Sequence, residues 1–492
     1  MKSNKPLVAV LVALILVALC ACVFTVALFG WNMRTQITDV ISNPEAYLDN
    51  LDTATAEPEV LTQVGDSVDL ESLFQPMWEV NDILHYDFYN QPVDDGVFAQ
   101  GAIDGLMASL EALEIDPASL SAASDAPSAG TLADEAGTPD ALYEPMLPFW
   151  ETWRNIQYGA TDLDTSYEQL MRDAIHGAVG AMGDQHTSFM DPVQLRQADL
   201  ELQGNYEGIG AWVDTGGDYV VIIAPMQGSP AEAAGLRAGD QVLAIDGEDM
   251  LVIGSDLAVN RILGPAGTPV VLTIGREGEE PFDVTIIRSR IVVPSVESEM
   301  LEGNIGYIQL FTFGADTSED MRAALEELMA QNPSGLILDL RNNGGGYLDT
   351  AVDITSEFLS SGVVLLEDYN DGSRYTYEVE PGGIATSVPL VVLVNGGSAS
   401  ASEILAGALQ DYERAALVGE TTYGKGSVQI SRMLSNNQGA VRVTIARWLT
   451  PDERQIHGVG LEPDYAVPLT QEDVDAERDP QLDEAIRLLN GN

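Results

Sequence analysis

Residues 390–404 read Leu-Val-Val-Leu-Val-Asn-Gly-Gly-Ser-Ala-Ser-Ala-Ser-Glu-Ile. The five apolar residues 390–394 are typical of a strand that is buried on both faces, and the run that begins at Ser400 predicts a helix. Upstream the same alternation recurs, with apolar strands expected at 306–311 and 335–340 and helices at 318–331 and 348–359. Strands that alternate with helices predict a layered α/β core, which we place at residues 293–470.

Residues 204–292, directly before this core, follow a different pattern of short strands and glycine turns. Strands are expected at 209–213, 219–223, 241–245, 270–274 and 283–287, with helices at 230–234 and 254–263. This spacing predicts a small separate domain. After the core, an acidic tail at 471–492 is expected to contain a helix at 480–489.

The region 34–203 is predicted to be helical. Two of its segments, 101–110 and 173–182, are similar at an offset of 72 residues, and Tyr86 and Tyr158 keep the same offset. A duplicated helical hairpin and a chance similarity of two Ala/Gly-rich helices both explain this. Residues 117–139, rich in Ala, Ser, Pro, Gly and Asp, contain little apolar surface, which predicts a disordered linker.

Length and charge exclude several functions. The chain has 492 residues, enough for about three domains. Its 77 Asp and Glu residues against 22 Lys and Arg residues give a formal charge of −55. A surface this negative repels phosphate backbones and anionic lipid headgroups, so nucleic-acid binding and peripheral attachment to lipid are not expected.

Cysteine and histidine content argues against metal chemistry. The two cysteines, Cys20 and Cys22, both lie in the apolar N-terminal run, so the rest of the chain has no disulfide, thiolate nucleophile or Cys-ligated metal. The four histidines show no metal-ligand spacing. We therefore expect no metal and no cofactor.

The N-terminus is predicted to cross a membrane once. Residues 7–29 are 23 uncharged, almost wholly apolar residues, which at 1.5 Å per residue span a bilayer core. Lys2 and Lys5 precede the run, which favours a cytoplasmic N-terminus. We interpret residues 1–33 as a signal anchor with the remainder outside the cytoplasmic membrane, and a cleaved signal or a lipid on Cys20 or Cys22 is the alternative.

Ser400 is the candidate nucleophile. It follows an apolar strand and opens a helix, where free backbone N–H groups and the positive end of the helix dipole can stabilise an oxyanion. The alternative is that Ser398, Ser400 and Ser402 are only capping residues. Glu403, in the first turn, is interpreted as a residue that compensates the helix dipole.

Lys425 is the candidate general base. Lys2, Lys5 and Lys425 are the only lysines of the chain, and every other basic residue beyond the anchor is arginine. Arginine stays protonated in a protein, whereas a desolvated lysine can become neutral and accept a proton from a serine hydroxyl. The flanking Gly424 and Gly426 allow close backbone approach. These residues indicate a Ser-Lys dyad.

The stretch Ser229-Pro-Ala-Glu-Ala-Ala-Gly-Leu-Arg-Ala-Gly-Asp-Gln-Val-Leu-Ala-Ile-Asp-Gly247 resembles a PDZ domain. Gly208, Ile209 and Gly210 stand where such a domain has its carboxylate-binding loop. That loop directs backbone N–H groups at the terminal carboxylate of a peptide, which adds a strand beside it. Peptide capture is therefore expected, although some PDZ folds serve only as packing units.

Residues 158–468 resemble the carboxyl-terminal processing (tail-specific) serine peptidases. Besides the PDZ core, the matching blocks are Asp339-Leu-Arg-Asn-Asn-Gly-Gly-Gly346, Ser398-Ala-Ser-Ala-Ser-Glu-Ile404, Val418-Gly-Glu-Thr-Thr-Tyr-Gly-Lys-Gly-Ser-Val-Gln429, Asp184-Gln-His-Thr-Ser188 and Gly458-Val-Gly-Leu-Glu-Pro-Asp464. We expect the Asp184–Ser188 block to be helical. The resemblance implies a crotonase-like α/β peptidase core with an inserted PDZ domain. Together with the sequence pattern, it gives an expected architecture of one N-terminal transmembrane helix, a helical N-terminal region and this core.

The resemblance also implies the site. The implied residues are Ser400 as nucleophile, Lys425 as general base, Gln429 as an orienting residue, and the amides of Ala401 and of Gly345 or Gly346 as oxyanion hole. Gly344 stands where the family usually has proline, which leaves the choice between the two glycines open. His186 and His457 are interpreted as structural.

The function expected from these observations is a serine endopeptidase that recognises protein C-termini and needs no cofactor. The main rival is an exported PDZ scaffold on an inactive peptidase fold, against which Ser400, Lys425 and Gln429 argue. An acyl-CoA enzyme fits the core fold but neither the PDZ domain nor an extracytoplasmic location.

Overall fold

The computed structural model describes residues 68–492 except 161–162, 164, 203–204, 215–218, 227, 251–254, 277, 293, 471, 474–475, 477 and 492. The predicted membrane anchor, with Cys20 and Cys22, lies outside these residues. Within the described part of the chain, no helix is both long and apolar enough to cross a bilayer.

A six-stranded sheet forms the centre of the α/β core. Its strands, in spatial order, are β10 (Val296–Leu301), β11 (Ile305–Leu310), β12 (Gly335–Asp339), β15 (Leu390–Val394), β16 (Ala416–Gly419) and β19 (Tyr465–Ala466). β10 runs antiparallel to β11, and the other neighbours are parallel. Parallel strands need helical crossovers, so both faces of this sheet are covered.

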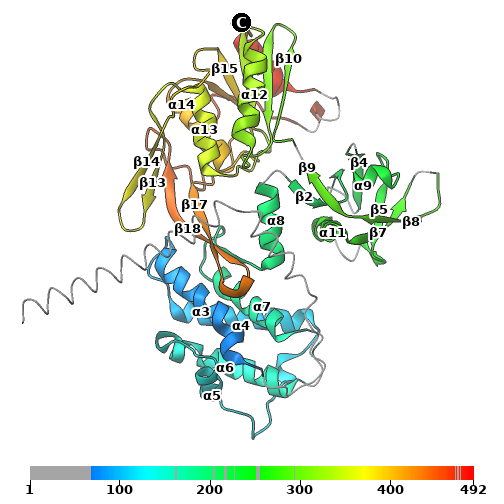
Figure 1. Ribbon diagram of the computed structural model, residues 1–492, viewed down its shortest axis with the longest axis vertical. Helices are drawn as coiled ribbons and strands as arrows, with labels where there is room; N and C mark the ends of the chain where they lie inside the picture. Colours follow the sequence, from blue (N-terminus) through cyan, green and yellow to red (C-terminus); the bar gives the residue numbers. More distant parts are fainter. Residues whose placement is uncertain are drawn as a thin grey trace, which may run out of the picture. The chain divides into compact units, whose positions relative to one another are not determined.

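Helices cover the two faces of the sheet. Helices α12 (Thr317–Met329), α13 (Leu348–Phe358) and α14 (Ala401–Asp411) lie side by side on one face (Figure 1), against residues such as Leu338 and Val392. The C-terminal helix α16 (Pro480–Leu489) packs on the other face, against Ile337 and Val391. Successive residues of a strand point to opposite faces of the sheet, so neighbouring residues such as Ile337 and Leu338 pack against different helices. The predicted α/β alternation is confirmed.

A second sheet packs beside the first and was not predicted. Its members are β1 (Ser188–Met190), β13 (Val363–Tyr369), β14 (Arg374–Glu378), β17 (Ser427–Met433) and β18 (Ala440–Leu449). The prediction of a helix at Asp184–Ser188 is wrong. The Asp184 carboxylate accepts hydrogen bonds from the Thr187 hydroxyl at 2.7 Å and from the His186 amide at 3.3 Å, which closes a turn that leads into β1.

Residues 205–292 form the expected small β domain. Its elements are β2 (Asn205–Gly208), β3 (Ala211–Asp214), β4 (Val220–Pro225), α9 (Pro230–Ala233), β5 (Gln241–Ile245), β6 (Glu248–Asp249), α11 (Ser255–Ile262), β7 (Pro269–Gly275), β8 (Phe282–Ile287) and β9 (Ser289–Val292). Aliphatic side chains of β4, β5, β7 and α11 make its separate core. The pair β2–β9 stands where the chain enters and leaves the domain.

The region before β1 is helical. It contains α3 (Leu70–Asp87), α4 (Asp95–Ala112), the 3₁₀ turn η1 (Pro117–Ser119), α5 (Ala129–Glu135), α6 (Asp140–Gly159) and α7 (Tyr167–Gly180), and α8 (Pro192–Leu202) follows β1. Arg432 of β17 pairs with Asp87 of α3 at 2.8 Å, which ties the helices to the second sheet.

The prediction of a disordered linker at 117–139 is wrong. Helix α5 lies within it, and Leu132 is fully buried in the aromatic core of the helical region. Trp78 Nε1 donates to the carbonyl of Ala136 at 2.9 Å, and Arg154 Nε donates to that of Pro127 at 2.6 Å. Contacts supplied by distant helices therefore order a segment that has few apolar residues of its own.

Helices α4 and α7 favour the duplication over chance similarity. Their first residues, Asp95 and Tyr167, are 72 positions apart, as are Asp87 and Gly159, the last residues of α3 and α6. At this offset Gly101 corresponds to Asp173, and Gly105 corresponds to Gly177. Gly101 contacts Gly177 and Gly105 contacts Asp173, so each contact has its counterpart in the other copy. The two helical hairpins thus pack with an internal two-fold relation.

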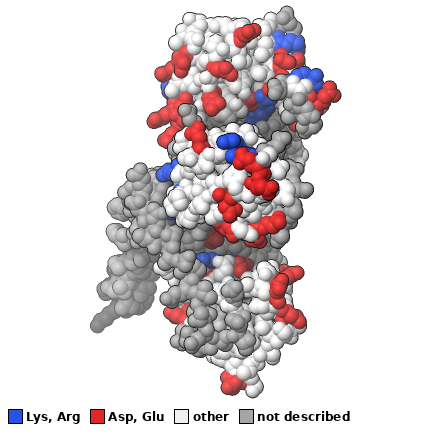
Figure 2. All heavy atoms as spheres, turned by 90° about the vertical axis from the view of Figure 1, so that its right-hand side faces the viewer, with Lys and Arg blue, Asp and Glu red and all other residues white. Residues whose placement is uncertain are grey.

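The acidity of the sequence appears at the surface. On the face shown in Figure 2, acidic side chains are spread over the visible surface and outnumber the basic ones, as the formal charge of −55 requires.

Candidate active site

Ser400 occupies a strained turn between β15 and α14. Its backbone angles, φ +55° and ψ −114°, are rarely adopted by a residue with a side chain. Ser398 and Ser402 are fully buried, and their hydroxyls donate at 2.8 Å to the carbonyls of Leu340 and Asn343. Ser400 is partly exposed. Of the three serines, it is therefore the one that a substrate can reach.

The glycine loop, residues 341–346, follows β12 and passes directly beside this turn. Gly345 has φ +103°, and a Cβ there would lie 2.9 Å from both Ser400 Cβ and the Ala401 nitrogen. Its own N–H donates to Asn343 Oδ1 at 2.9 Å, whereas within the described residues the Gly346 N–H has no acceptor. Of the two predicted glycines, Gly346 has the unused donor. Ala401, as the first residue of α14, supplies a second N–H.

Glu403 connects the turn at Ser400, called here the nucleophile turn, to the lysine loop, residues 421–426. Its side chain is fully buried and accepts four hydrogen bonds. One oxygen accepts from the Ser400 amide at 2.8 Å and the Lys425 amide at 2.9 Å, and the other from the Thr422 hydroxyl at 2.6 Å and the Gly424 amide at 2.7 Å. The interpretation as a dipole-compensating residue alone is therefore too narrow. The Ser-x-x-Glu spacing of a capping box was the signal that could have revealed it.

Lys425 lies just before β17 in a half-buried position. Burial lowers the pKa of its ammonium below 10.5, and the positive charge of Arg442 lowers it further, while the carboxylates of Glu403 and Asp184 oppose both effects. Among the described residues, no hydrogen bond or ion pair joins the ammonium to Ser400 or Gln429. What brings the two segments together is the shared Glu403 carboxylate.

Gln429, on β17, is held by two hydroxyls rather than by Lys425. Its side-chain nitrogen donates to Ser427 at 2.9 Å and to Thr444 at 3.2 Å. Burial raises the pKa of the nearby Asp184 carboxyl, but interaction with the Thr444 and Thr187 side chains keeps that pKa below its usual value. Gln429 therefore belongs to a polar network with Ser427 and Thr444, and its side-chain carbonyl oxygen accepts no hydrogen bond from a described residue.

His186 and His457, which were interpreted as structural from the sequence, lie near Lys425 and Gly426. The rings of His186 and His457 are 6.0 Å apart. Burial lowers the pKa of both, and for His186 the second cause is the charge of Lys425. Nothing local in the sequence could predict this, because His186 precedes β1 and His457 follows β18, far apart in the chain.

The predicted carboxylate-binding loop lies between β2 and β3 of the β domain. The carbonyls of Ile209 and Gly210 accept hydrogen bonds from Ala231 and Met226, at 2.8 and 3.0 Å. The amides of the same two residues have no acceptor within the described part of the chain. Gly208 ends β2 and Gly210 has φ +75°, so the loop turns away from the strand with its N–H groups unused.

Comparison with known proteins finds matches to both the α/β core and the β domain. The sequence pattern of peptidase family S41 matches residues 304–467, and that of the PDZ domain matches residues 221–276. The carboxy-terminal processing protease CtpA of Bacillus subtilis is 35% identical over 329 residues, which cover 67% of this chain and 69% of that protein. A carboxyl-terminal-processing protease of Synechocystis is 38% identical over 391 residues, with 74% and 91% covered.

Among solved structures, the chain is similar to the photosystem II D1 C-terminal processing protease. The two are 27% identical, and the match covers 75% of this chain and 93% of that one with a TM-score of 0.43.

Proposed function

The chain belongs to peptidase family S41, a family of serine peptidases, and on that premise we propose that it captures protein C-terminal tails on its PDZ domain and cleaves them at Ser400 through an acyl-enzyme. The observation that carries the proposal is the Glu403 oxygen shared by the Ser400 and Lys425 amides. Two bonds of that length hold the backbone nitrogens within about 6 Å of each other. The backbone at Ser400 and the backbone at Lys425 thus lie next to each other, on either side of the Glu403 carboxylate.

The proposed reaction uses Lys425 as the base, Ser400 as the nucleophile and two backbone amides as the oxyanion hole. Neutral Lys425 Nζ takes the proton of Ser400 Oγ as that oxygen bonds to the scissile carbonyl carbon, and the carbonyl electron pair moves to its oxygen. The N–H groups of Ala401 and Gly346 donate to this oxyanion. The lysine ammonium then gives its proton to the leaving amine as the C–N bond breaks. Water hydrolyses the resulting ester by the same proton transfers.

A fluorophosphonate probe tests the proposal directly. It should label the full-length protein at Ser400 and leave Ser400→Ala unlabelled, because only an activated serine displaces its leaving group. A PDZ scaffold on an inactive peptidase fold would remain unlabelled under the same conditions. Failure to label the wild-type protein would therefore favour that rival.

The pH profile follows from the identity of the base. Only neutral Lys425 accepts a proton, so kcat/KM should rise with pH through a single ionisation below the ordinary lysine value of 10.5. Arg442→Gln removes a cation that disfavours the ammonium, so the rise should move to higher pH. A profile that instead saturates above an ionisation near the histidine value of 6.5 would assign the base to His186.

Tail recognition predicts that a free C-terminal carboxylate matters. The unused amides of Ile209 and Gly210 would make charge-assisted hydrogen bonds to it, and loss of the charge is expected to cost about the energy of one such bond, roughly 1.5–3 kcal/mol. Amidating the C-terminus of a peptide substrate should therefore reduce kcat/KM by about 10- to 150-fold. The control is a short peptide that contains the cleavage site alone, for which amidation should change little. Equal cleavage of the free and amidated long peptides would show that the PDZ domain only packs.

We also propose that the catalytic part lies outside the cytoplasmic membrane, tethered by a single span. The support is the apolar run 7–29 with lysines before it. In spheroplasts, added protease should digest the catalytic part without lysis. Digestion that requires lysis would place it on the cytoplasmic side.

A further inference from the structure

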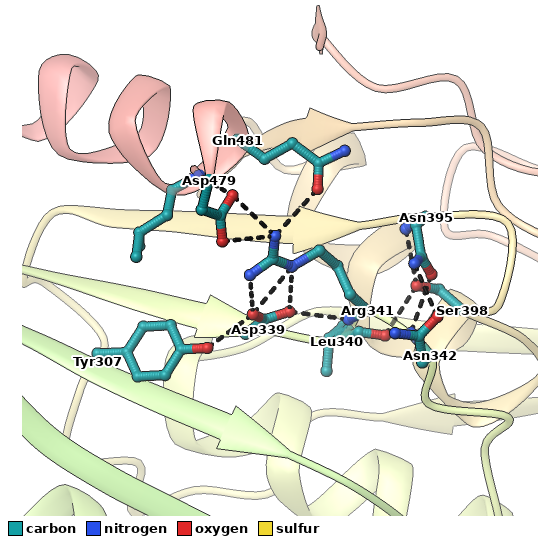
Figure 3. Close-up of polar contacts among 10 residues, drawn as sticks. Tyr307, Asp339, Leu340, Arg341, Asn342, Asn395, Ser398, Asp479 and Gln481 are labelled. Carbon is teal, nitrogen blue, oxygen red and sulfur yellow. Dashed lines mark hydrogen bonds and ion pairs between the residues drawn. The ribbon is translucent and has the colours of Figure 1, made fainter. Parts of the chain in front are cut away.

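The first residue of the glycine loop is held by the C-terminal helix. Figure 3 shows the Arg341 guanidinium between Asp339, at the end of β12, and the start of α16. Its Nε donates to both oxygens of Asp339 at 3.0 Å. Its Nη1 donates to Asp479 and to Gln481, each at 3.0 Å. One side of the planar Arg341 guanidinium therefore binds the end of β12, and the other binds the start of α16.

The network continues from Arg341 to the nucleophile turn. Asn342 and Asn395 exchange two hydrogen bonds of 2.9 Å, from the Asn342 amide to Asn395 Oδ1 and from Asn395 Nδ2 to Asn342 Oδ1. The Asn395 amide donates to the Ser398 hydroxyl, which donates to the carbonyl of Leu340 (Figure 3). The loop that begins at Arg341 is thus bonded along its length to the turn that holds Ser400.

This anchoring matters because the loop has little stiffness of its own. Residues 344–346 are three consecutive glycines, which have the widest backbone freedom of any residue. Asn343, fully buried, holds the middle of the loop by donating to the Leu310 carbonyl at 2.6 Å. The beginning of the loop depends on Arg341, and half of the contacts of that guanidinium come from α16.

Helix α16 is well placed to act as a fixed support. Asp479 caps it by accepting from the Leu482 amide at 2.9 Å, and the Gln481 side chain, almost fully buried, donates to the Val467 carbonyl at 2.8 Å. Farther along, Leu489 packs on Gly335, where a Cβ would come within 2.8 Å of it. The helix therefore cannot shift along the sheet without losing these contacts.

We propose that Asp479 and Gln481 are positioning residues for the peptidase reaction. They fix Arg341, and through it the backbone amides of the glycine loop, at the place where the oxyanion forms. This inference rests on the proposed function, since it assigns the loop a part in oxyanion binding. It goes beyond it in making the C-terminal helix, on the face of the sheet opposite α14, a part of the catalytic apparatus.

The test compares four variants of the full chain with the wild-type protein. Asp479→Asn removes the charge of the first acceptor of Arg341 Nη1 but keeps an oxygen that can cap α16, and the double variant Asp479→Asn/Gln481→Met also removes the second acceptor, the Gln481 side-chain oxygen. Glu484→Gln is the matched control, because Glu484 lies on the same helix and pairs only with Arg487 in the described structure. Asp479→Glu keeps a carboxylate at this position, so its activity should be closer to wild type than that of Asp479→Asn.

We expect kcat to fall by about 10- to 100-fold in the double variant and by less in Asp479→Asn, with KM within a factor of two, because misplaced donors weaken transition-state binding. Hydrogen exchange of the loop amides 342–347 should become about tenfold faster or more, while the control keeps wild-type values. A merely structural role would lower the melting temperature and leave kcat and loop exchange unchanged.

The two proposals fail in distinguishable ways. If the wild-type protein is not labelled by fluorophosphonate and cleaves nothing, the proposed function fails, and loop exchange still decides whether α16 holds the loop. If the wild-type protein is active and the double variant keeps wild-type kcat or wild-type loop exchange, the positioning role is overturned and the proposed function stands.

Discussion

Ser400→Ala and Lys425→Arg should each lower peptide cleavage by about 10⁴-fold or more, because removing one member of a nucleophile–base unit costs nearly as much as removing both. Lys425→Arg is the sharper variant, since it keeps the positive charge and loses the only group able to become a neutral base. The Lys425 side chain makes no hydrogen bond to another described residue, so circular dichroism and thermal melting should remain close to wild type.

Three comparisons make this result interpretable. The double variant Ser400→Ala/Lys425→Arg should be no less active than either single variant, as expected for residues that act together. Arg374→Lys, on the exposed β13–β14 hairpin, is a control for arginine–lysine exchange and should keep full activity. Turnover by Lys425→Arg within tenfold of wild type would refute the dyad and direct attention to His186.

Much of the fold could be predicted because its strongest elements are specified locally. The strand at 390–394 and the helix at 480–489 were predicted with the observed bounds, since each has a clear apolar pattern between turn or capping residues. The strand predicted at 306–311 is shifted by one residue to Ile305–Leu310. Within the β domain, the strand at 241–245 matches its prediction fully.

The errors arise where distant residues decide the local structure. Residues 117–139 have a composition typical of a linker, yet Leu132 is buried by helices from both sides of the segment. Likewise, Asp184–Ser188 lies between helices in the sequence, but strand β18, more than 250 positions later, recruits Ser188 into a sheet. No window of local sequence contains that partner.

The site shows the same division. Ser400 and Lys425 could be found because each has a local signal, a strand-to-helix turn and an isolated lysine between glycines. Gln429 and the oxyanion glycines came from family resemblance alone. The proximity of His186 to Lys425 depends on tertiary structure. The role of Glu403 was missed because the partners of its second oxygen, Thr422 and Gly424, lie in a different loop.

Glu403→Gln should reduce kcat/KM by about 10²- to 10³-fold and lower the free energy of unfolding by about 2–4 kcal/mol. The carboxylate receives four donors, and an amide has only one oxygen, so at least one backbone N–H must face the new NH₂ group. The Thr422 hydroxyl can rotate and accept a hydrogen bond from the new NH₂ group. The glutamine nitrogen should therefore take the place of the Glu403 oxygen that lies near Thr422 and Gly424. The Gly424 N–H is then left buried without an acceptor, and the lysine loop moves away from Ser400.

The pH profile of the residual activity of Glu403→Gln distinguishes a local change at Lys425 from a general loss of folded protein. The Glu403 carboxylate raises the pKa of Lys425, because a negative charge stabilises the ammonium. Without that charge the lysine loses its proton more readily, so the rise of kcat/KM with pH should move to lower pH even as its height falls. Ser402→Ala is the matched control: it removes a buried hydrogen bond one residue away, to Asn343, and carries no charge. It should lower stability and leave the midpoint of the pH profile in place. A Glu403→Gln protein whose midpoint is unchanged, or shifted to higher pH, would contradict the electrostatic link between Glu403 and the base.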